Sequence, residues 1–237
     1  MKIVHVAVTA PYIDGWGYQE NLLPLYQLKQ GDQITIIASD IVPPYLRGKT
    51  FKTGKYINNG VTVIRIPGKK ITNTLIISSS FSDLLEQEKP DIIFHHNVNC
   101  TSLITVAKYK RKHPECTVFC DNHADYINQS KSFLWRLIYY RLFIRGGLKI
   151  YGKYIDKFYG VTPQRCDYIE EVFSIPKEKV DFLPIGADVD FAKLLPSRGV
   201  LLSKYGFKET DFIIVSGGKM GKGKGTDVLI NVAKELY

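Results

Sequence analysis

Short apolar runs alternate with amphipathic stretches along most of this 237-residue chain. The apolar runs, which favour strands, cover residues 2–9, 33–39, 60–68, 91–96, 116–121, 157–162, 179–184 and 211–217. The amphipathic stretches, which favour helices, cover residues 17–31, 74–90, 100–113, 131–147, 225–237 and the segment between 162 and 179. The strands are apolar almost without a break, as in a parallel sheet that helices cover on both faces. The pattern therefore predicts an α/β fold built on an open parallel sheet.

The alternation breaks at residues 185–210, beginning with the segment IGADVDFAKLLPSRG. We predict a domain boundary there, with a first domain at residues 1–190. Residues 191–237 then hold a linker and one βα unit of a second domain. A single unit of this kind cannot bury its own faces, so we expect the second domain to be incomplete within this chain.

The formal charge of +9 and the pI near 9.2 favour an anionic partner, such as nucleic acid, phosphate groups or an anionic membrane. A basic surface without a specific ligand is the alternative. No motif typical of nucleic-acid binding is present, so we expect no nucleic-acid partner. The four cysteines include no CxxC pair, which favours free thiols in a reducing cytoplasm over a zinc site. The sequence also lacks a signal-peptide pattern and a long apolar run, and we expect a cytoplasmic location.

Ligands of an open parallel sheet bind beyond the carboxyl ends of its strands, so the loops that follow strands carry the candidate sites. After the first strand, Gly15 and Gly17 let the backbone approach a ligand. Tyr18 and Gln19 follow at the start of a helix whose free N–H groups suit an anion. This loop is a candidate acceptor or phosphate site, and an ordinary tight turn is the alternative.

A second glycine-rich loop, GGKMGKGKG, covers residues 217–225 between the last predicted strand and the last predicted helix. Its glycines permit close backbone approach, its lysines carry positive charge, and the helix start completes a site for an anion. It is not a Walker A loop, because Gly225 follows Lys224 where serine or threonine is required. A flexible basic loop without a ligand is the alternative.

Polar side chains also follow the fourth and fifth predicted strands. The segment HHNVN places His96 and Asn97 at the end of one strand, and CDNHADY places Asn122 and His123 after the next. A carboxylate near a histidine, as at Asp121 and His123, suits a catalytic pair or part of a metal site, but the further ligands that a metal needs are not evident. A hydrogen-bonded structural histidine is the alternative at each strand end.

The predicted helix at residues 131–147 interleaves arginines with large apolar and aromatic side chains. It is too charged to span a bilayer. It is suited to lie at a membrane interface, with its arginines at lipid phosphates and its aromatic rings at headgroup level. A buried helix whose arginines reach solvent is the alternative.

The order of these segments resembles the retaining glycosyltransferases of family 4, which have the GT-B fold. GWGYQENLLPLYQLKQGDQITIIAS is similar to that family's glycine loop, first helix and second strand, and KPDIIFHH to its P-D-hydrophobic-H strand. CTVFCDNHADY resembles the strand and loop with the family's active-site histidine. VDFLPIGADVDFAKLLP resembles the I-P-N-G-V-D signature, with Ile185 in the asparagine position. FIIVSGGKMGKGKGTDVLINVAKEL resembles the G-R-L-x-x-x-K-G segment, with Lys219 in place of arginine.

The resemblance implies two Rossmann-like domains with the active site between them. Residues 1–190 would be the acceptor-binding N-terminal domain, and residues 191–237 would begin the donor-binding domain. His123 would be catalytic and would contact the donor sugar. The donor diphosphate would meet Gly218, Lys219, Lys224 and Gly225. The glycine loop, with Gly15, Gly17, Tyr18 and Gln19, would face the acceptor or a phosphate, and the acceptor site would include His96, Asn97 and Asn122.

By the same resemblance, the protein would be a hexosyltransferase that moves a sugar, with retention, from a nucleotide-sugar to a polysaccharide, glycolipid or other saccharide. Lysines would offset the charge of the leaving diphosphate, with no metal and no cofactor. The basic aromatic helix at 131–147 and the net positive charge, rather than the resemblance, suggest a peripheral location on the inner face of the cell membrane. The family's Glu-x7-Glu segment does not occur before Tyr237, so we expect a fragment or truncated product that is inactive alone. A non-enzymatic Rossmann-like module that binds a phosphorylated ligand or a partner is the alternative.

Overall fold

The structure is a computed structural model that describes residues 1–43, 46, 49–71, 75–127, 132–217 and 225–235. Its internal contacts divide the chain into two compact units, Met1–Asp188 and Val189–Tyr237. The roles predicted for residues 1–190 and 191–237 stay predictions.

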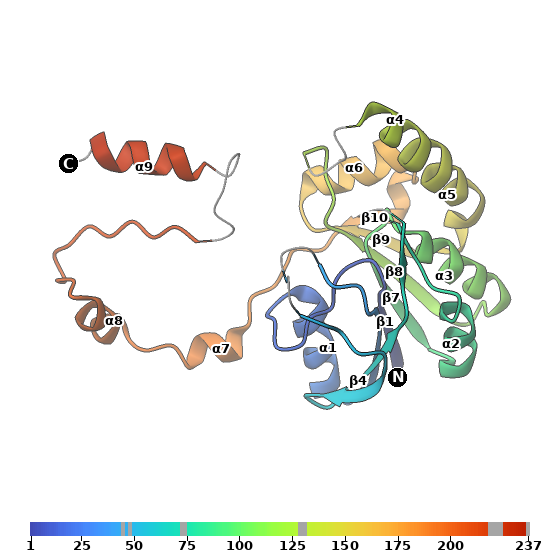
Figure 1. Cartoon of the computed structure of the whole chain (residues 1–237), viewed down its shortest axis with the longest axis horizontal. Coiled ribbons are helices and arrows are strands. Elements are labelled where there is room, and N and C mark those ends of the chain that lie inside the picture. The colour runs from blue at the N-terminus through green and yellow to red at the C-terminus, as the bar shows by residue number, and fades with distance from the viewer. Residues whose placement is uncertain (44–45, 47–48, 72–74, 128–131, 218–224, 236–237) are drawn as a thin grey trace. The chain divides into compact units, whose positions relative to one another are not determined.

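The first unit is built on an eight-stranded sheet with the strand order β10-β9-β8-β7-β1-β2-β4-β3 (Figure 1). The strands are β1 (Lys2–Ala7), β2 (Gln33–Ser39), β3 (Gly54–Asn58), β4 (Val61–Ile66), β7 (Ile92–His96), β8 (Thr117–Asn122), β9 (Lys157–Gly160) and β10 (Val180–Phe182). Every neighbouring pair is parallel except β3 and β4, which are antiparallel. The α/β fold with a mostly parallel sheet is as predicted.

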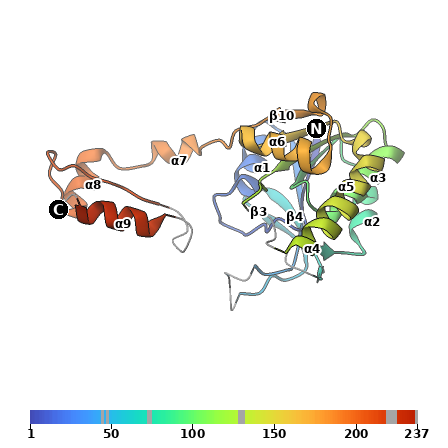
Figure 2. The ribbon, with the colours of Figure 1, turned by 90° about the horizontal axis from the view of Figure 1, so that it is seen from above.

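Helices cover both faces of this sheet. They are α1 (Gln19–Lys29), α2 (Phe81–Glu88), α3 (Thr101–Lys112), α4 (Phe133–Trp135), a π-helix (Arg136–Ile144), α5 (Arg145–Tyr151) and α6 (Pro163–Phe173), with short 3-10 turns at Gly152–Tyr154 and Lys177–Lys179. α1 lies on one side of the sheet, and α2, α3 and α5 lie on the other (Figures 1 and 2). Alternation along β1 explains this division, because Ile3 and Ala7 pack in the core beneath α1 while Val4 and Val6 pack in the larger core on the opposite face.

The sequence predictions for the first unit differ from the structure in three places. The helix predicted at 74–90 begins only at Phe81, and Ile76–Ile77 (β6) instead pairs with Lys69–Lys70 (β5) in a small antiparallel ladder. The strand β3 was not predicted, because its exposed and partly polar residues occupy the sheet edge. The helix predicted at 131–147 is present from Phe133 onward, but it is made of three consecutive helical segments with a π-helix in the middle.

The second unit contains α7 (Val189–Lys193), α8 (Arg198–Tyr205) and α9 (Thr226–Glu235). Leu202 is its only described residue that is buried. The strand predicted at 211–217 is absent, because a strand needs a neighbour for its backbone groups and the described part of this unit offers none. The predicted βα unit is thus represented by its helix alone. Across the described ranges of both units, no helix is long and apolar enough to cross a membrane.

Candidate functional site

The strand order of the sheet changes direction at β1. β2 follows on one side of β1, whereas β7 lies on the other side and leads on to β8, β9 and β10. In open parallel sheets, ligands bind outside the carboxyl ends of the strands at such a switch point. The carboxyl ends of β7 and β8 carry His96, Asp121 and Asn122, and His123 follows directly.

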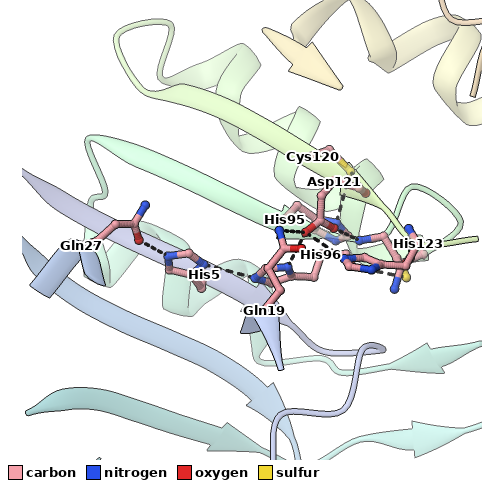
Figure 3. Close-up of polar contacts among 10 residues, drawn as sticks. His5, Gln19, Gln27, His95, His96, Cys120, Asp121 and His123 are labelled. Carbon is pink, nitrogen blue, oxygen red and sulfur yellow. Dashed lines mark hydrogen bonds and ion pairs between the residues drawn. The ribbon is translucent and has the colours of Figure 1, made fainter. Parts of the chain in front are cut away.

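The Asp121 carboxylate is the centre of a polar cluster at this edge (Figure 3). It is fully buried, and its Oδ2 lies 2.8 Å from His96 Nδ1. The same oxygen accepts a hydrogen bond of 3.3 Å from Gln19 Nε2 and lies 3.4 Å from His123 Nε2. Its Oδ1 accepts a hydrogen bond of 3.0 Å from the backbone N–H of Asn97. Residues from α1, β7, β8 and the following loops therefore converge on one carboxylate.

The cluster continues from His96 through His5, in β1, to Gln27, in α1. Gln27 Oε1, in α1, lies 2.6 Å from His5 Nε2, and His5 Nδ1 lies 3.2 Å from His96 Nε2. An amide oxygen only accepts, so His5 Nε2 carries the proton and His5 Nδ1 accepts from His96. Because the Asp121 carboxylate accepts from the other nitrogen of His96, both ring nitrogens of His96 are protonated. His96 is therefore an imidazolium paired with a buried carboxylate.

The electrostatics of the three groups agree with this assignment. Burial, reinforced by the charge of His96, lowers the pKa of His5 to about 3 and keeps that ring neutral. Burial also lowers the pKa of His96, but the charge of Asp121 and its hydrogen bond outweigh burial, and the pKa of His96 is raised. Burial raises the pKa of Asp121, but the charge of His96 and the contacts with His123 bring it well below its usual range. Opposite charge thus keeps both partners ionised without solvent.

His123 is the member of the cluster that reaches the surface. Its side chain is 25% exposed, whereas those of His96 and Asp121 are fully buried. Its backbone N–H donates to Asn97 Oδ1 over 3.2 Å. Asn97 itself has a φ of 78°, a left-handed conformation that asparagine tolerates better than most residues. The loop is therefore fixed at its backbone, while the ring rests against an anionic carboxylate and is left accessible to a ligand.

The other predicted residues of the first unit divide into two groups. Gln19 joins the Asp121 cluster. Asn122 is buried and binds the Ala124 backbone through both ends of its amide, at 2.8 Å and 3.3 Å. Gly15 has a φ of 76° and, with Trp16 and Asn21 among others, lines a cavity of about 30 Å³. Gly17 and Tyr18 take no part in the hydrogen bonds of the cluster described above, and Tyr18 is the exposed residue that precedes α1.

In the second unit, Gly218, Lys219 and Lys224 lie outside the described residues. Gly225 has a φ of 74° and directly precedes α9, so it occupies the helix start that the sequence predicted for an anion site. Within the described ranges, no group of three or more histidine, cysteine, aspartate or glutamate side chains is arranged to hold a metal ion.

Sequence reasoning missed two members of the cluster, His5 and Gln27. The available signal was His5 itself, a single polar residue inside the apolar strand KIVHVA. The neighbouring His95 proves structural: it is buried, with Nε2 2.8 Å from Ser102 Oγ and Nδ1 3.8 Å from Cys120 Sγ. The four cysteines are free, as predicted.

Comparison of the sequence with models of known protein families identifies the family to which the chain belongs. The model described as Glycosyltransferase Family 4 matches residues 25–191, which is more than half of the chain. The chain belongs to glycosyltransferase family 4. The Rossmann-like sheet of this family 4 protein is that of the GT-B fold, and the cluster around Asp121 includes the loop that resembles the family's active-site segment.

The solved structure of a glycosyltransferase from Rickettsia africae ESF-5 supports the fold. It matches with a TM-score of 0.62 and 16% identity, over 99% of this family 4 chain and 57% of that chain. The catalytic domain of starch synthase IV from Arabidopsis thaliana, bound to ADP and acarbose, matches with a TM-score of 0.45 and 16% identity, over 80% of this chain and 52% of that one. This chain therefore spans a little more than half the length of the first structure. None of the curated protein sequences compared with it shows a significant match.

Proposed function

We propose that this chain is part of a nucleotide-sugar-dependent hexosyltransferase that passes a sugar, with retention, to a polysaccharide, glycolipid or other saccharide. Residues 1–190 would hold the acceptor, and residues 191–237 would begin the donor-binding part. Membership of glycosyltransferase family 4 supports the class of reaction. The observation that carries the assignment of the site is the Asp121–His123 pair at the switch point of the sheet.

The chemistry requires that negative charge be stabilised on a leaving diphosphate. The bond from the anomeric carbon to the diphosphate breaks, a bond from that carbon to the oxygen of an acceptor hydroxyl forms, and the proton of that hydroxyl passes to the leaving diphosphate. We propose that Lys219 and Lys224, with the backbone at Gly218 and Gly225, offset the growing charge on the diphosphate. In this scheme the leaving group needs no metal ion and no cofactor.

His123 would act on the sugar side of the same reaction. Its ring rests 3.4 Å from Asp121 and is partly exposed, so it can contact a bound sugar without first being ordered. His96 is buried with both nitrogens bonded to protein, and this geometry favours a role in holding Asp121 over direct contact with an acceptor. Asn97 and Asn122 would shape the acceptor side of the loop through the backbone bonds described above.

A second candidate function is a non-enzymatic module that binds a phosphorylated ligand or a partner. Leu202 is the only buried residue in the described part of the second unit, so a donor site there would lack a core of its own. This favours the second candidate for residues 1–237. On this basis we also propose that residues 1–237 alone do not turn over a nucleotide-sugar at a useful rate.

A donor screen separates the two candidates. The full-length gene product is titrated calorimetrically with a panel of nucleotide-sugars, and diphosphate release is followed with saccharide acceptors. We expect Lys219→Ala and Lys224→Ala each to weaken donor binding about tenfold or more, since a hydrogen bond to a charged group contributes about 1.5–3 kcal/mol. Lys52→Ala, at an exposed lysine before β3, is the matched control. Binding of a phosphorylated ligand without turnover of any nucleotide-sugar would favour the second candidate.

A cytoplasmic protein with a lipid-linked acceptor would work at the inner face of the cell membrane. We propose such a peripheral location as part of this function. The surface that would carry it is identified below.

A further inference from the structure

The rod formed by α4, the π-helix and α5 is apolar on more than the side that it buries. Its buried or half-buried stripe runs through Trp135, Tyr139, Tyr140, Ile144 and Leu148, so that successive turns bury residues four or five positions apart. The outward positions would be polar in an ordinary surface helix. Here they are Phe133, Leu134, Leu137, Ile138, Leu142 and Phe143, and all six are exposed.

Two exposed arginines stand among these apolar side chains. Arg136 and Arg141 make no ion pair with any described residue. The Nε atom of the neighbouring Arg145 is buried and has no hydrogen-bond partner among the described residues. The sequence from Ile127 to Ile155 contains no aspartate or glutamate. Positive charge on this face is therefore not neutralised from within its own segment.

A cavity of about 310 Å³ opens beside the two arginines. It is lined by Tyr126, Phe133, Arg136, Leu137, Tyr140, Arg141 and Val172. The hydroxyl of Tyr126, in this lining, donates a hydrogen bond to the Glu171 carboxylate. The cavity presents two guanidinium groups on an apolar wall, which suits a phosphate attached to an apolar chain.

We propose that this surface, the α4–α5 face, docks the protein on an anionic membrane and that the cavity between Arg136 and Arg141 takes a lipid phosphate. The α4–α5 face is defined by Phe133, Leu134, Arg136, Leu137, Ile138, Arg141, Leu142 and Phe143. The apolar side chains enter the headgroup boundary, and the arginines remain at the level of the phosphates. Membrane docking rests on the proposed function only for its purpose. That purpose is to bring the acceptor side of the enzyme to a lipid-linked acceptor.

Charge complementarity favours a membrane over a protein partner. Two exposed arginines that are unpaired within the described structure and a long segment without carboxylates match a diffuse anionic surface, which needs no residue-by-residue register. A second copy of this chain would bring the same positive face against itself, and like charges would oppose that contact.

The test is co-sedimentation of the full-length gene product with vesicles of phosphatidylcholine alone or mixed with phosphatidylglycerol. We expect binding to the anionic vesicles only, weakened by added salt. Arg136→Glu with Arg141→Glu should lower the partition coefficient by roughly 25-fold or more, since each basic residue near an anionic surface contributes about fivefold. Soluble glycerol phosphate should not displace the protein, because it lacks the apolar chain.

Two further variants test whether vesicle binding depends on the α4–α5 face in particular. Lys52→Glu with Lys55→Glu makes the same change of net charge near β3, at the opposite edge of the sheet from β10, and should reduce binding far less. Leu142→Ser with Phe143→Ser leaves the charge unchanged and should also release the protein from vesicles. Thermal unfolding of each variant reports whether it is folded, and Arg136→Gln with Arg141→Gln replaces the glutamate variant if that one is not.

Three results would overturn the proposal. The first is that the protein does not bind anionic vesicles at low salt, and the second is that the Lys52 and Lys55 variant loses as much vesicle binding as the Arg136 and Arg141 variant. The third is that the Leu142 and Phe143 variant changes the oligomeric state but not vesicle binding. The outcome is separable from that of the proposed function, because His123→Ala should lower kcat for sugar transfer about 100-fold or more and leave vesicle binding unchanged.

Discussion

Asp121 is buried at the end of β8 among His96, Gln19 and His123, whereas Arg136 and Arg141 are exposed on the α4–α5 face without an ion-pair partner among the described residues. Both places carry charge, and both lie in the first unit. In one, every charge is met by an opposite charge or a hydrogen bond from the protein. In the other, positive charge is exposed among apolar side chains and has no ion-pair partner in the part of the chain that the structure describes.

The difference separates two uses of charge. A buried ion pair is strongly coupled to folding, because removal of one partner leaves the other uncompensated away from water. An exposed arginine is weakly coupled to folding and remains free to interact with something else. We therefore expect substitutions at the Asp121 cluster to affect stability and catalysis together, and those on the α4–α5 face to affect binding alone.

The largest expected effect on stability is at Asp121. Asp121→Asn leaves the His96 imidazolium buried without its counter-charge, and we expect a loss of about 3–5 kcal/mol in the free energy of unfolding. Urea unfolding measures this loss. Asp181→Asn is the matched control, because Asp181 lies at 2.6 Å from Lys157 in an exposed pair whose removal should cost less than about 1 kcal/mol. Equal costs at the two sites would contradict the buried ion pair.

The pH dependence of stability gives the next largest effect. The pKa of His5 and that of His95 are both lowered to about 3, chiefly by burial. Below the ordinary value of about 6.5 the unfolded chain binds protons that the folded rings do not, so the free energy of unfolding falls as pH decreases toward 3. The two rings together give a slope of up to about 3 kcal/mol per pH unit.

His96 works in the opposite direction over a different range. Its pKa is raised, so its contribution is complete below about 6.5 and is lost as pH rises through its folded pKa. Urea unfolding at a series of pH values between about 5 and 6 therefore reports chiefly on His5 and His95. His95→Gln should halve the slope in that range, and an unchanged slope would mean that His95 is not buried as a neutral ring.

The smallest expected effect is on the α4–α5 face. Arg136→Gln with Arg141→Gln should change the free energy of unfolding by less than about 0.5 kcal/mol, because neither side chain has an ion-pair partner among the described residues. Ile144→Ala, in the buried stripe of the same rod, should cost about 2–5 kcal/mol. Chemical denaturation of both variants measures the contrast. A large cost for the arginine pair would mean that the face is part of the fold.

The strands that form the middle of the sheet were predictable because each is a short apolar run, buried on both faces. The edge strand β3 was not, because its exposed residues lack that signal. The apolar run at 211–217 looks like a buried strand in sequence, but strand formation also depends on a neighbour that sequence periodicity does not reveal. The π-helix escaped prediction because the same residues fit an α-helical stripe almost as well.

At the site, the sequence placed His96, Asn97, Asn122 and His123 together because they follow neighbouring strands. It could not identify the hydrogen-bond partners that come from distant parts of the chain. Gln27 and His5 are 22 positions apart, and His5 and His96 are 91 apart, so only the register of β1 between β2 and β7 brings them into line. The central role of Asp121 follows from that register.

The central claim is that His123, held against Asp121 at the switch point of the sheet, serves sugar transfer. The most direct test is kcat for sugar transfer by the full-length gene product, with the donor identified by the nucleotide-sugar screen. We predict that His123→Ala lowers kcat about 100-fold or more while the protein stays folded, and that His113→Ala, at the end of α3, leaves kcat near the wild-type value. A folded His123→Ala enzyme with wild-type kcat would contradict the account.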